Sequence, residues 1–159
     1  MHSLHALRGI AVVMTVWLGT CPGAAIGDFT LNLKVQAGRR EQTVVSGKPN
    51  IPLPVFPAKV MEVVSVQWSA VNGVRDVTLS DVTLHVFMDR ASSSANVKPS
   101  AKALYESAVI VDFEPGAKSI GEFRMPMPES GKYLVRVETI GAAKKVGREI
   151  VAEMQVFVE

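Results

Sequence analysis

Cysteine and histidine are scarce in this chain of 159 residues, which contains one cysteine and three histidines. The lone cysteine, Cys21, has no disulfide partner within the chain, so stability must come from a hydrophobic core. After residue 27 the sequence holds one histidine, His85, and no thiol. Nucleophilic catalysis needs a nucleophile, a base and an orienting group together, and this chemistry therefore lacks support.

Catalytic motifs are missing as well. The sequence has no Gly-x-Ser-x-Gly elbow, no Ser-x-x-Lys pair and no phosphate-binding loop. Asp112 and Glu114 have the same parity, as a pair of catalytic carboxylates would need, but Glu114 begins a Pro-Gly turn, where acids are common. The sequence therefore predicts a protein that is not an enzyme and that carries no cofactor.

Neither sign of charge dominates the composition. Seventeen Lys and Arg residues stand against fifteen Asp and Glu residues, which gives a net charge of +2. The basic doublets Arg39–Arg40 and Lys144–Lys145 both fall in predicted turns, where solvated charge is the ordinary state. Nucleic-acid binding needs a concentrated basic surface, so we expect no nucleic-acid partner.

The long apolar run of the chain lies at its N-terminus. Residues 9–18 (GIAVVMTVWL) follow the basic Arg8 and precede a small-residue stretch that ends at Gly27. Ten apolar residues suit the core of a secretory signal and are too few for a membrane-spanning helix. We therefore predict a signal peptide over residues 1–27, cleaved after Gly27, and no membrane span in residues 28–159. The alternative is a buried helix of the domain.

Cys21 allows a second interpretation of the N-terminus. Residues 18–21 (LGTC) resemble a bacterial lipobox, whose cysteine becomes lipid-modified and starts the mature chain. Thr20 departs from the small residue that this motif places before its cysteine, and Pro22 is unfavourable after it. Lipidation of Cys21 would anchor the protein to a membrane without changing its domain.

Residues 28–159 show the period-two alternation of half-buried strands and are predicted to form one domain. Phe29, Leu31, Leu33 and Val35 share one face, for example, and later segments repeat the pattern. A change of parity at residues 80–81 indicates a turn or bulge, and Asn72–Gly73 predicts a tight turn. With turn signals at short intervals and no sustained helical period, we expect an antiparallel sandwich of seven to nine strands.

One hairpin resembles a known architecture. Residues 121–137 run from Gly121 through a Pro-Glu-Ser-Gly turn into Gly131-Lys-Tyr133-Leu-Val135-Arg-Val137. This pattern resembles the late hairpin of bacterial immunoglobulin-like and transthyretin-like modules. In these modules the tyrosine packs inward and returns its hydroxyl to a nearby backbone group. The resemblance implies an immunoglobulin-like or transthyretin-like β-sandwich and says nothing of function.

The segment 49–57 (PNIPLPVFP) differs from its surroundings because four of its nine residues are proline. Proline enforces an extended path and excludes a central position in a sheet. The segment still carries apolar side chains that favour burial, at Ile51, Leu53, Val55 and Phe56. They predict either a crossing segment that closes one end of the sandwich or a docking strip for another protein.

A metal-carrier function is the alternative that the sequence offers. Cu(I) is bound by soft thioethers together with histidine, and His85, Met125 and Met127 supply such atoms. Met125 and Met127 also continue the inward row of a strand, and core packing is the favoured explanation for them. His85 and Met88 differ by three positions and should point to opposite faces.

Together these patterns predict an exported, non-enzymatic β-sandwich that acts as an accessory module. We expect its partner to be another envelope or secreted protein, and we expect it in the bacterial periplasm or secreted medium. A periplasmic carrier of a small ligand or of Cu(I) remains the alternative.

Overall fold

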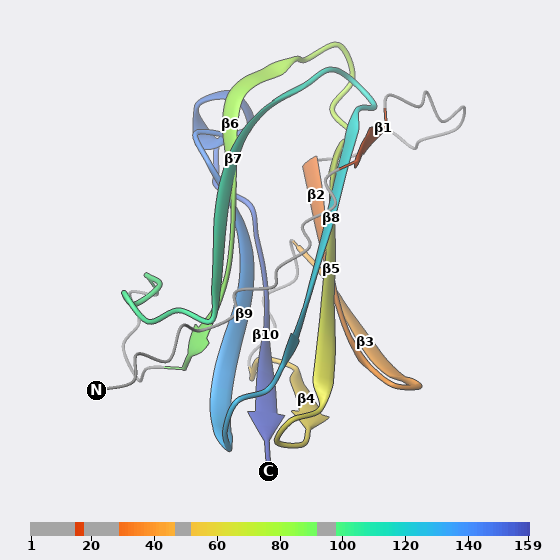
Figure 1. Cartoon of the computed structure of the whole chain (residues 1–159). Helices are drawn as coiled ribbons and strands as arrows, with labels where there is room; N and C mark the ends of the chain where they lie inside the picture. The colour runs from red at the N-terminus through yellow and green to blue at the C-terminus, as the bar shows by residue number, and fades with distance from the viewer. Residues whose placement is uncertain (1–14, 18–28, 47–51, 92–97) are drawn as a thin grey trace.

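Two β-sheets face each other in the computed structural model, which describes residues 15–17, 29–46, 52–91 and 98–159 (Figure 1). After residue 27 the described chain forms nine strands and one short helix, preceded by the three-residue β1. The elements are β1 (Thr15–Trp17), β2 (Phe29–Ala37), β3 (Arg40–Val45), β4 (Val55–Ala58), β5 (Val63–Asn72), β6 (Leu79–Arg90), β7 (Tyr105–Phe113), β8 (Lys118–Pro126), β9 (Gly131–Ile140), α1 (Ala143–Val146) and β10 (Val151–Val158).

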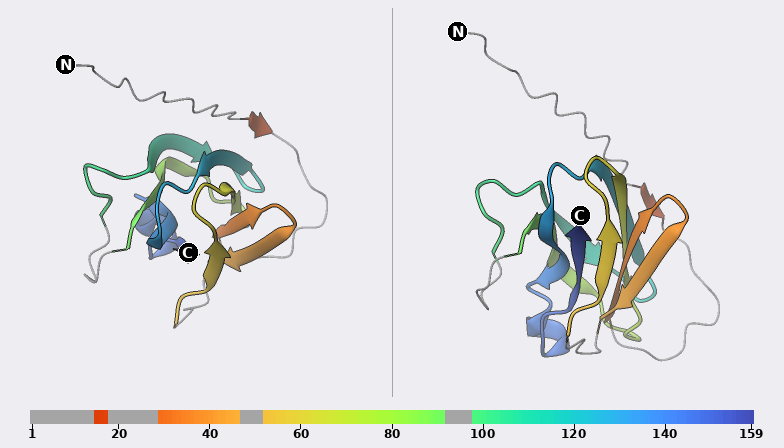
Figure 2. Two further views of the ribbon diagram at one scale, coloured as in Figure 1. Left: turned by 60° about the horizontal axis from the view of Figure 1, so that its bottom comes forward. Right: turned by 90° about the horizontal axis from the view of Figure 1, so that it is seen from below.

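Each sheet has five strands. The first, called here the β5 sheet, has the order β1-β8-β5-β2-β3, and the second, the β9 sheet, has the order β4-β10-β9-β6-β7 (Figure 2). Neighbouring strands are antiparallel, except that β4 runs parallel to β10. The predicted all-β sandwich is thereby confirmed.

The core fills the space between the two sheets, as the alternation predicted. Every second residue of β2 is buried, and β5 and β10 follow the same rule. The bulky Trp68 lies opposite Gly121 on β8, where a Cβ atom would stand 2.1 Å from Trp68 Cζ2. Gly121 is therefore required by the indole ring, since any side chain there would overlap it.

The parity change in β6 is a bulge. The pairing of β6 with β7 shifts its register between Leu79 and Val82, and Asp81 adopts a φ of 57°. Both Leu79 and Val82 are consequently buried although their positions have opposite parity. Met88 faces the core as expected, whereas the His85 side chain lies on the outer face of the sheet.

Asn72 does not form the tight turn that Asn72–Gly73 predicted. β5 ends at Asn72 in one sheet and β6 begins at Leu79 in the other, so the connection is an arch and not a hairpin. The fully buried Asn72 amide donates to the carbonyls of Val77, Phe113 and Glu114 at 2.8, 3.0 and 3.2 Å. It therefore joins the β5–β6 arch to the β7–β8 turn.

Several sequence predictions fall on residues outside the described part of the chain. These predictions concern Ile51 and residues 1–27, including Cys21. Of residues 1–27 the structure describes only 15–17, and their backbone pairs with Lys118–Ile120 of β8. The signal peptide, its cleavage after Gly27 and lipidation of Cys21 remain predictions. Within the described ranges, no helix has the length and apolar character needed to cross a membrane.

Candidate binding surface

The proline-rich segment enters the β9 sheet as its edge strand β4. Val156 and Val158 of β10 stand beside Phe56 and Ala58, and all four side chains are buried. Val55 points to the other side of the sheet and is 50% exposed, whereas Leu53 is half-buried. The predicted docking residues are thus divided between the core and the surface.

Arg40 of β3 covers the outward edge of β4. Its Nη1 donates to the Pro57 carbonyl at 2.7 Å, and its guanidinium carbon lies 5.7 Å from the centre of the Phe56 ring. Pro57 has no N–H, so this position offers neither a donor nor an unoccupied acceptor to an added strand. Any partner that uses β4 would therefore contact side chains more readily than backbone.

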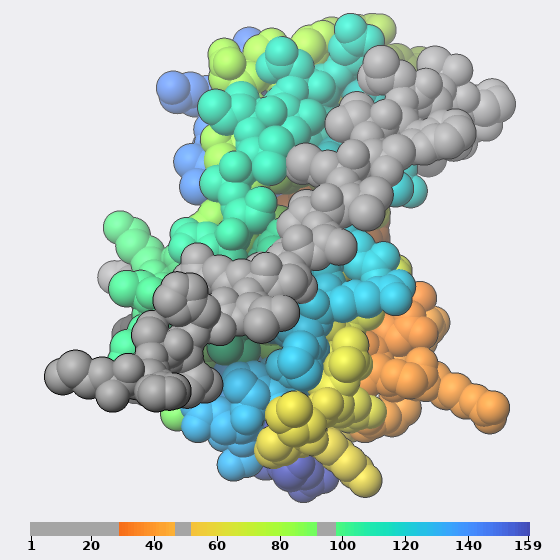
Figure 3. Space-filling view, in the orientation of Figure 1, coloured from red at the N-terminus to blue at the C-terminus, as the bar shows by residue number. Residues whose placement is uncertain are grey.

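Exposed apolar side chains gather where β4 leads into β5. Nine large hydrophobic residues are exposed in the described part of the chain, and five of them belong to β4, the following turn, the start of β5 and the end of β10. We call this surface the β4–β5 end; its residues are Val55, Val60, Met61, Val63 and Phe157. In Figure 3 the yellow β4–β5 segment and the dark-blue end of the chain lie together at the lower tip.

Met61 is the most exposed residue of the β4–β5 end, and its backbone has a left-handed conformation. Its side chain is 69% exposed, and its φ of 65° lies in a region that costs a residue with a Cβ about 1 kcal/mol or more. Two backbone hydrogen bonds hold this conformation, from Met61 N–H to Met127 at 2.8 Å and from Met127 N–H to Glu62 at 3.0 Å. The fold therefore presents a flexible apolar side chain on a fixed turn.

The turn beside Met61 is fixed by Glu62. Arg40 Nη2 lies 2.6 and 2.7 Å from the two oxygens of this carboxylate, and the Lys59 N–H donates to it at 2.9 Å. The Arg40 hydrogen bond, followed by the Lys59 N–H, holds the pKa of Glu62 below its usual value. Arg40 consequently ties the turn of the β4–β5 end to β3.

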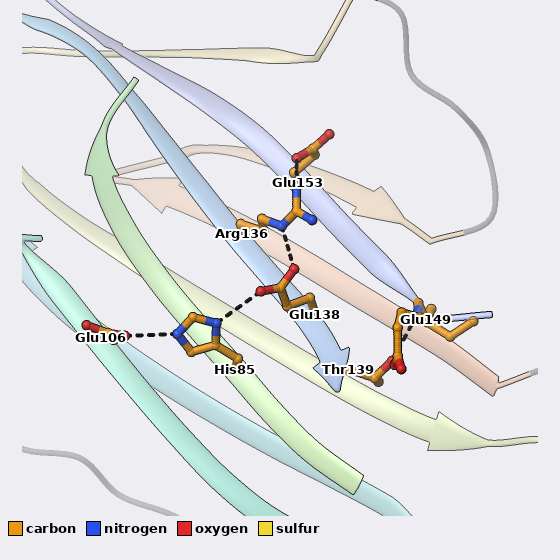
Figure 4. Close-up of polar contacts among 8 residues, drawn as sticks. His85, Glu106, Arg136, Glu138, Thr139, Glu149 and Glu153 are labelled. Atoms are coloured by element: carbon orange, nitrogen blue, oxygen red, sulfur yellow. Dashed lines mark hydrogen bonds and ion pairs between the residues drawn. The ribbon is translucent and has the colours of Figure 1, made fainter. Parts of the chain in front are cut away.

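His85 lies on a different surface, the outer face of the β9 sheet (Figure 4). Its Nδ1 and Nε2 atoms lie 3.0 and 3.1 Å from Glu138 and Glu106, respectively. Arg136 continues the chain of contacts at 2.8 Å from Glu138 and 3.0 Å from Glu153. These contacts link side chains of four strands, which is the arrangement of a structural surface network.

The three residues of the copper hypothesis are not brought into one site. His85 lies outside the β9 sheet, Met127 is buried in the core, and Met125 packs against the core from the β5 sheet. In the described ranges, no cluster of three or more His, Cys, Asp or Glu side chains is placed to hold a metal ion. Cu(I) binding stays a prediction without a site in this geometry.

The outer face of the β5 sheet carries a shallow groove of about 560 Å³. Two of its three charged side chains are already engaged: Lys34 pairs with Glu41 at 2.6 Å, and Glu122 contacts Arg124 and Ser65. The Arg124 hydrogen bond holds the pKa of Glu122 below its usual value although burial opposes this. The groove therefore presents no convergent set of unpaired polar groups.

Sequence reasoning missed the β4–β5 end for a specific reason. The buried residues Phe56, Ala58, Val64 and Val66 all have even numbers, so the alternation runs through the turn at residues 59–62 without a break. The alternation alone therefore gives no boundary between the two strands, whereas β4 ends at Ala58 and β5 begins at Val63. No local signal in the sequence marks Met61 as the tip of a turn.

The class of protein that the fold defines is an all-β two-sheet sandwich. No family model matches the sequence, and no curated protein matches it. Among solved structures, the chain is similar to the C-terminal domain of wzt, with 11% identity and a TM-score of 0.45 over 96% of this chain and 79% of that one. It is also similar to a family 123 glycoside hydrolase from Clostridium perfringens that was studied for glycolipid glycan hydrolysis, with 8% identity and a TM-score of 0.43. That match covers 66% of this chain but only 22% of the hydrolase.

Proposed function

We propose that this protein is an exported, non-enzymatic accessory module that binds another envelope or secreted protein through the β4–β5 end. The observation that carries the proposal is the exposure of Met61, 69%, on a turn whose conformation is unfavourable for methionine. Backbone strain that the surrounding structure maintains is typical of binding sites. Methionine also adapts its shape to a partner surface, which suits a contact site.

The remaining residues of the β4–β5 end support the same function. Val55 and Phe157 lie on the outer face of the β9 sheet, and Val60 and Val63 flank the turn at Met61. Single exposed apolar residues are normal on protein surfaces, but the exposure of five at one end of the sandwich favours an interface there. The rigid Arg40–Glu62 contact reduces the entropy that binding would cost.

We further propose that the sandwich is immunoglobulin-like or transthyretin-like. Tyr133 is buried, and its hydroxyl donates to the Glu129 carbonyl at 2.9 Å, as the sequence resemblance implied. A tyrosine that returns its hydroxyl to a residue a few positions upstream is characteristic of immunoglobulin-like domains. This contact supports the finer architecture and leaves the function to experiment.

The test is a pull-down of the tagged, natively exported chain from gently solubilised envelope, compared with two single variants. We expect one partner in near-stoichiometric amount with the native chain, and a loss of about tenfold or more with Met61→Lys, because interface contacts are dominated by a few central side chains. Ile140→Lys is the matched control, since Ile140 is 50% exposed on an interior strand away from the β4–β5 end. Recovery of the same partner by Met61→Lys would disprove the assigned surface, and absence of any partner would disprove the proposed function.

A further inference from the structure

β7 is the edge strand of the β9 sheet opposite β4. Among the described residues it pairs with β6 alone, so its outer side carries backbone N–H and C=O groups with no ladder partner. It is nine residues long, from Tyr105 to Phe113, and its sequence YESAVIVDF has no proline, glycine, lysine or arginine. A long edge strand without these residues is open to pairing with another strand.

The other edges of the sandwich are protected. β3 is short and begins with two charged residues, Arg40 and Glu41. β4 has Pro57, whose carbonyl Arg40 already occupies. β8 carries Lys118 and Arg124 and ends at Pro126, so its edge is protected without β1, which lies in the predicted signal peptide. Among these edges, β7 alone combines length with a lack of protection.

The side chains of β7 favour an added strand. Ile110 is 70% exposed, and Ala108 beside it is exposed as well. Val109 and Val111, on the inner side, are only half-buried, so the opposite sheet does not cover them completely. A neighbouring strand would remove apolar surface from water on both faces of β7, in addition to pairing its backbone.

The charges on β7 decide between a second copy of the chain and a different partner. Glu106 and Asp112 flank the uncharged centre, and both lie on the outer face; His85 contacts Glu106, and the Asp81 N–H donates to Asp112. In an antiparallel pair of two β7 strands, placing Ile110 opposite Ala108 sets Glu106 opposite Asp112. Like charges directly opposite destabilise a pair of strands, whereas basic residues there would stabilise it.

We propose that the outer edge of β7 accepts an extended segment of a partner protein as an added strand. The segment has an uncharged, β-branched centre flanked by Lys or Arg. Backbone hydrogen bonds supply the affinity, and the acids at the two ends of β7 supply the register and the preference for basic flanks. This site lies at the opposite edge of the sheet from β4 and is independent of the β4–β5 end.

The experiment titrates the full chain against fluorescent peptides and follows anisotropy. The probe is Lys-Thr-Val-Thr-Val-Thr-Lys; one control has Glu at both ends, and another has alternate backbone nitrogens methylated. We expect the probe to bind about tenfold or more tightly than either control, because one control opposes the acids of β7 and the other lacks ladder donors. Ile110→Lys should weaken the probe by a similar factor, whereas Ile140→Lys, on an interior strand, should leave it within about twofold.

Three results would overturn the proposal. They are no saturable binding of the probe, equal binding by Ile110→Lys, and equal binding of the methylated peptide. Concentration-dependent dimerisation that Ile110→Lys abolishes would identify a second copy of the chain as the occupant and would also overturn it. Because Met61 lies at the other edge, failure here leaves the pull-down comparison of Met61→Lys unaffected, so the two proposals fail separately.

Discussion

Arg40 and Glu62 form an ion pair in which the single atom Arg40 Nη2 lies 2.6 and 2.7 Å from the two carboxylate oxygens. Arg40 begins β3 in the β5 sheet, and Glu62 closes the turn after β4, an edge strand of the β9 sheet. Arg40 also donates to the Pro57 carbonyl of β4, so this one side chain contacts both ends of the turn that presents Met61 and links the two sheets there.

Replacing Glu62 by Gln should lower the free energy of unfolding by about 0.5–1 kcal/mol at pH 7, a value reduced for the exposure of Arg40. The pKa of Glu62 is lowered in the folded state, so its contribution is complete above the usual value of 4.5 and is lost as the pH falls through the lowered value. Urea unfolding of native protein and Glu62→Gln at pH 7 and pH 3 measures this. If the difference in the free energy of unfolding between the two proteins is as large at pH 3 as at pH 7, the stabilising role assigned to the Glu62 carboxylate is wrong.

Met61→Gly should raise stability while it weakens partner binding. Glycine adopts a φ of 65° without the clash that a Cβ causes, so relief of the turn should add about 0.5–1 kcal/mol to the free energy of unfolding. Thermal unfolding measures the first effect, and the envelope pull-down measures the second. A variant that is both stabilised and fully competent in binding would show that Met61 is not a contact residue.

Asn72→Ala should be among the most destabilising substitutions outside the apolar core. It leaves three carbonyls, on Val77, Phe113 and Glu114, without the amide that joins them. A buried acceptor that loses its donor costs about 1–3 kcal/mol of stability where water cannot replace the donor. We therefore expect Asn72→Ala to lower the free energy of unfolding by about 3 kcal/mol in total. Denaturant unfolding tests this, and a loss below about 1 kcal/mol would show that water replaces the amide.

Gly121→Ala should destabilise the fold by about 2 kcal/mol or more, because its Cβ would lie 2.1 Å from Trp68 Cζ2. Combining it with Trp68→Phe tests the cause, since the smaller ring leaves the space that the methyl group needs. The double variant should be more stable than the sum of the two single losses predicts. Strict additivity in chemical unfolding would mean that the strain arises elsewhere.

Tyr105→Phe should leave stability unchanged or raise it by about 1 kcal/mol. The ring stacks on Phe123 with centroids 3.9 Å apart, but in the described part of the chain the buried hydroxyl has no hydrogen-bond partner of good geometry. Burial raises the pKa of the Tyr105 phenol, and the nearby Ser107 offsets this slightly. A marked loss of stability in thermal unfolding would reveal a partner for the hydroxyl.

Strands could be predicted from the sequence where one face is buried in the core and the other is exposed to solvent. The alternation of Phe29, Leu31, Leu33 and Val35 correctly marked β2, and the parity change near Asp81 correctly marked a bulge. β3 was missed because Arg40-Glu-Gln-Thr lacks apolar alternation, which an edge strand does not need. Arg40 itself was expected to be a solvated charge in a turn.

The candidate surfaces were less predictable because they depend on residues far apart in the sequence. Arg40 meets Glu62 across 22 positions, and Phe157 joins Val55 only when β10 pairs with β4. The sequence of β7 does not reveal that its outer edge is exposed. The burial of its side chains depends on how far the opposite sheet extends, which local alternation does not show. Local patterns thus identify strands, whereas their edges are decided by tertiary structure.

The chain passes from one sheet to the other between β3 and β4, β4 and β5, β5 and β6, β7 and β8, and β8 and β9. Neither layer is therefore made from a continuous stretch of sequence, and no half of the chain contains a complete sheet. Folding must close long loops before most strands can pair, which places this protein among slowly folding, high-contact-order domains. During synthesis and folding, the interval before the layers assemble is when the unprotected edge strand is most open to aggregation.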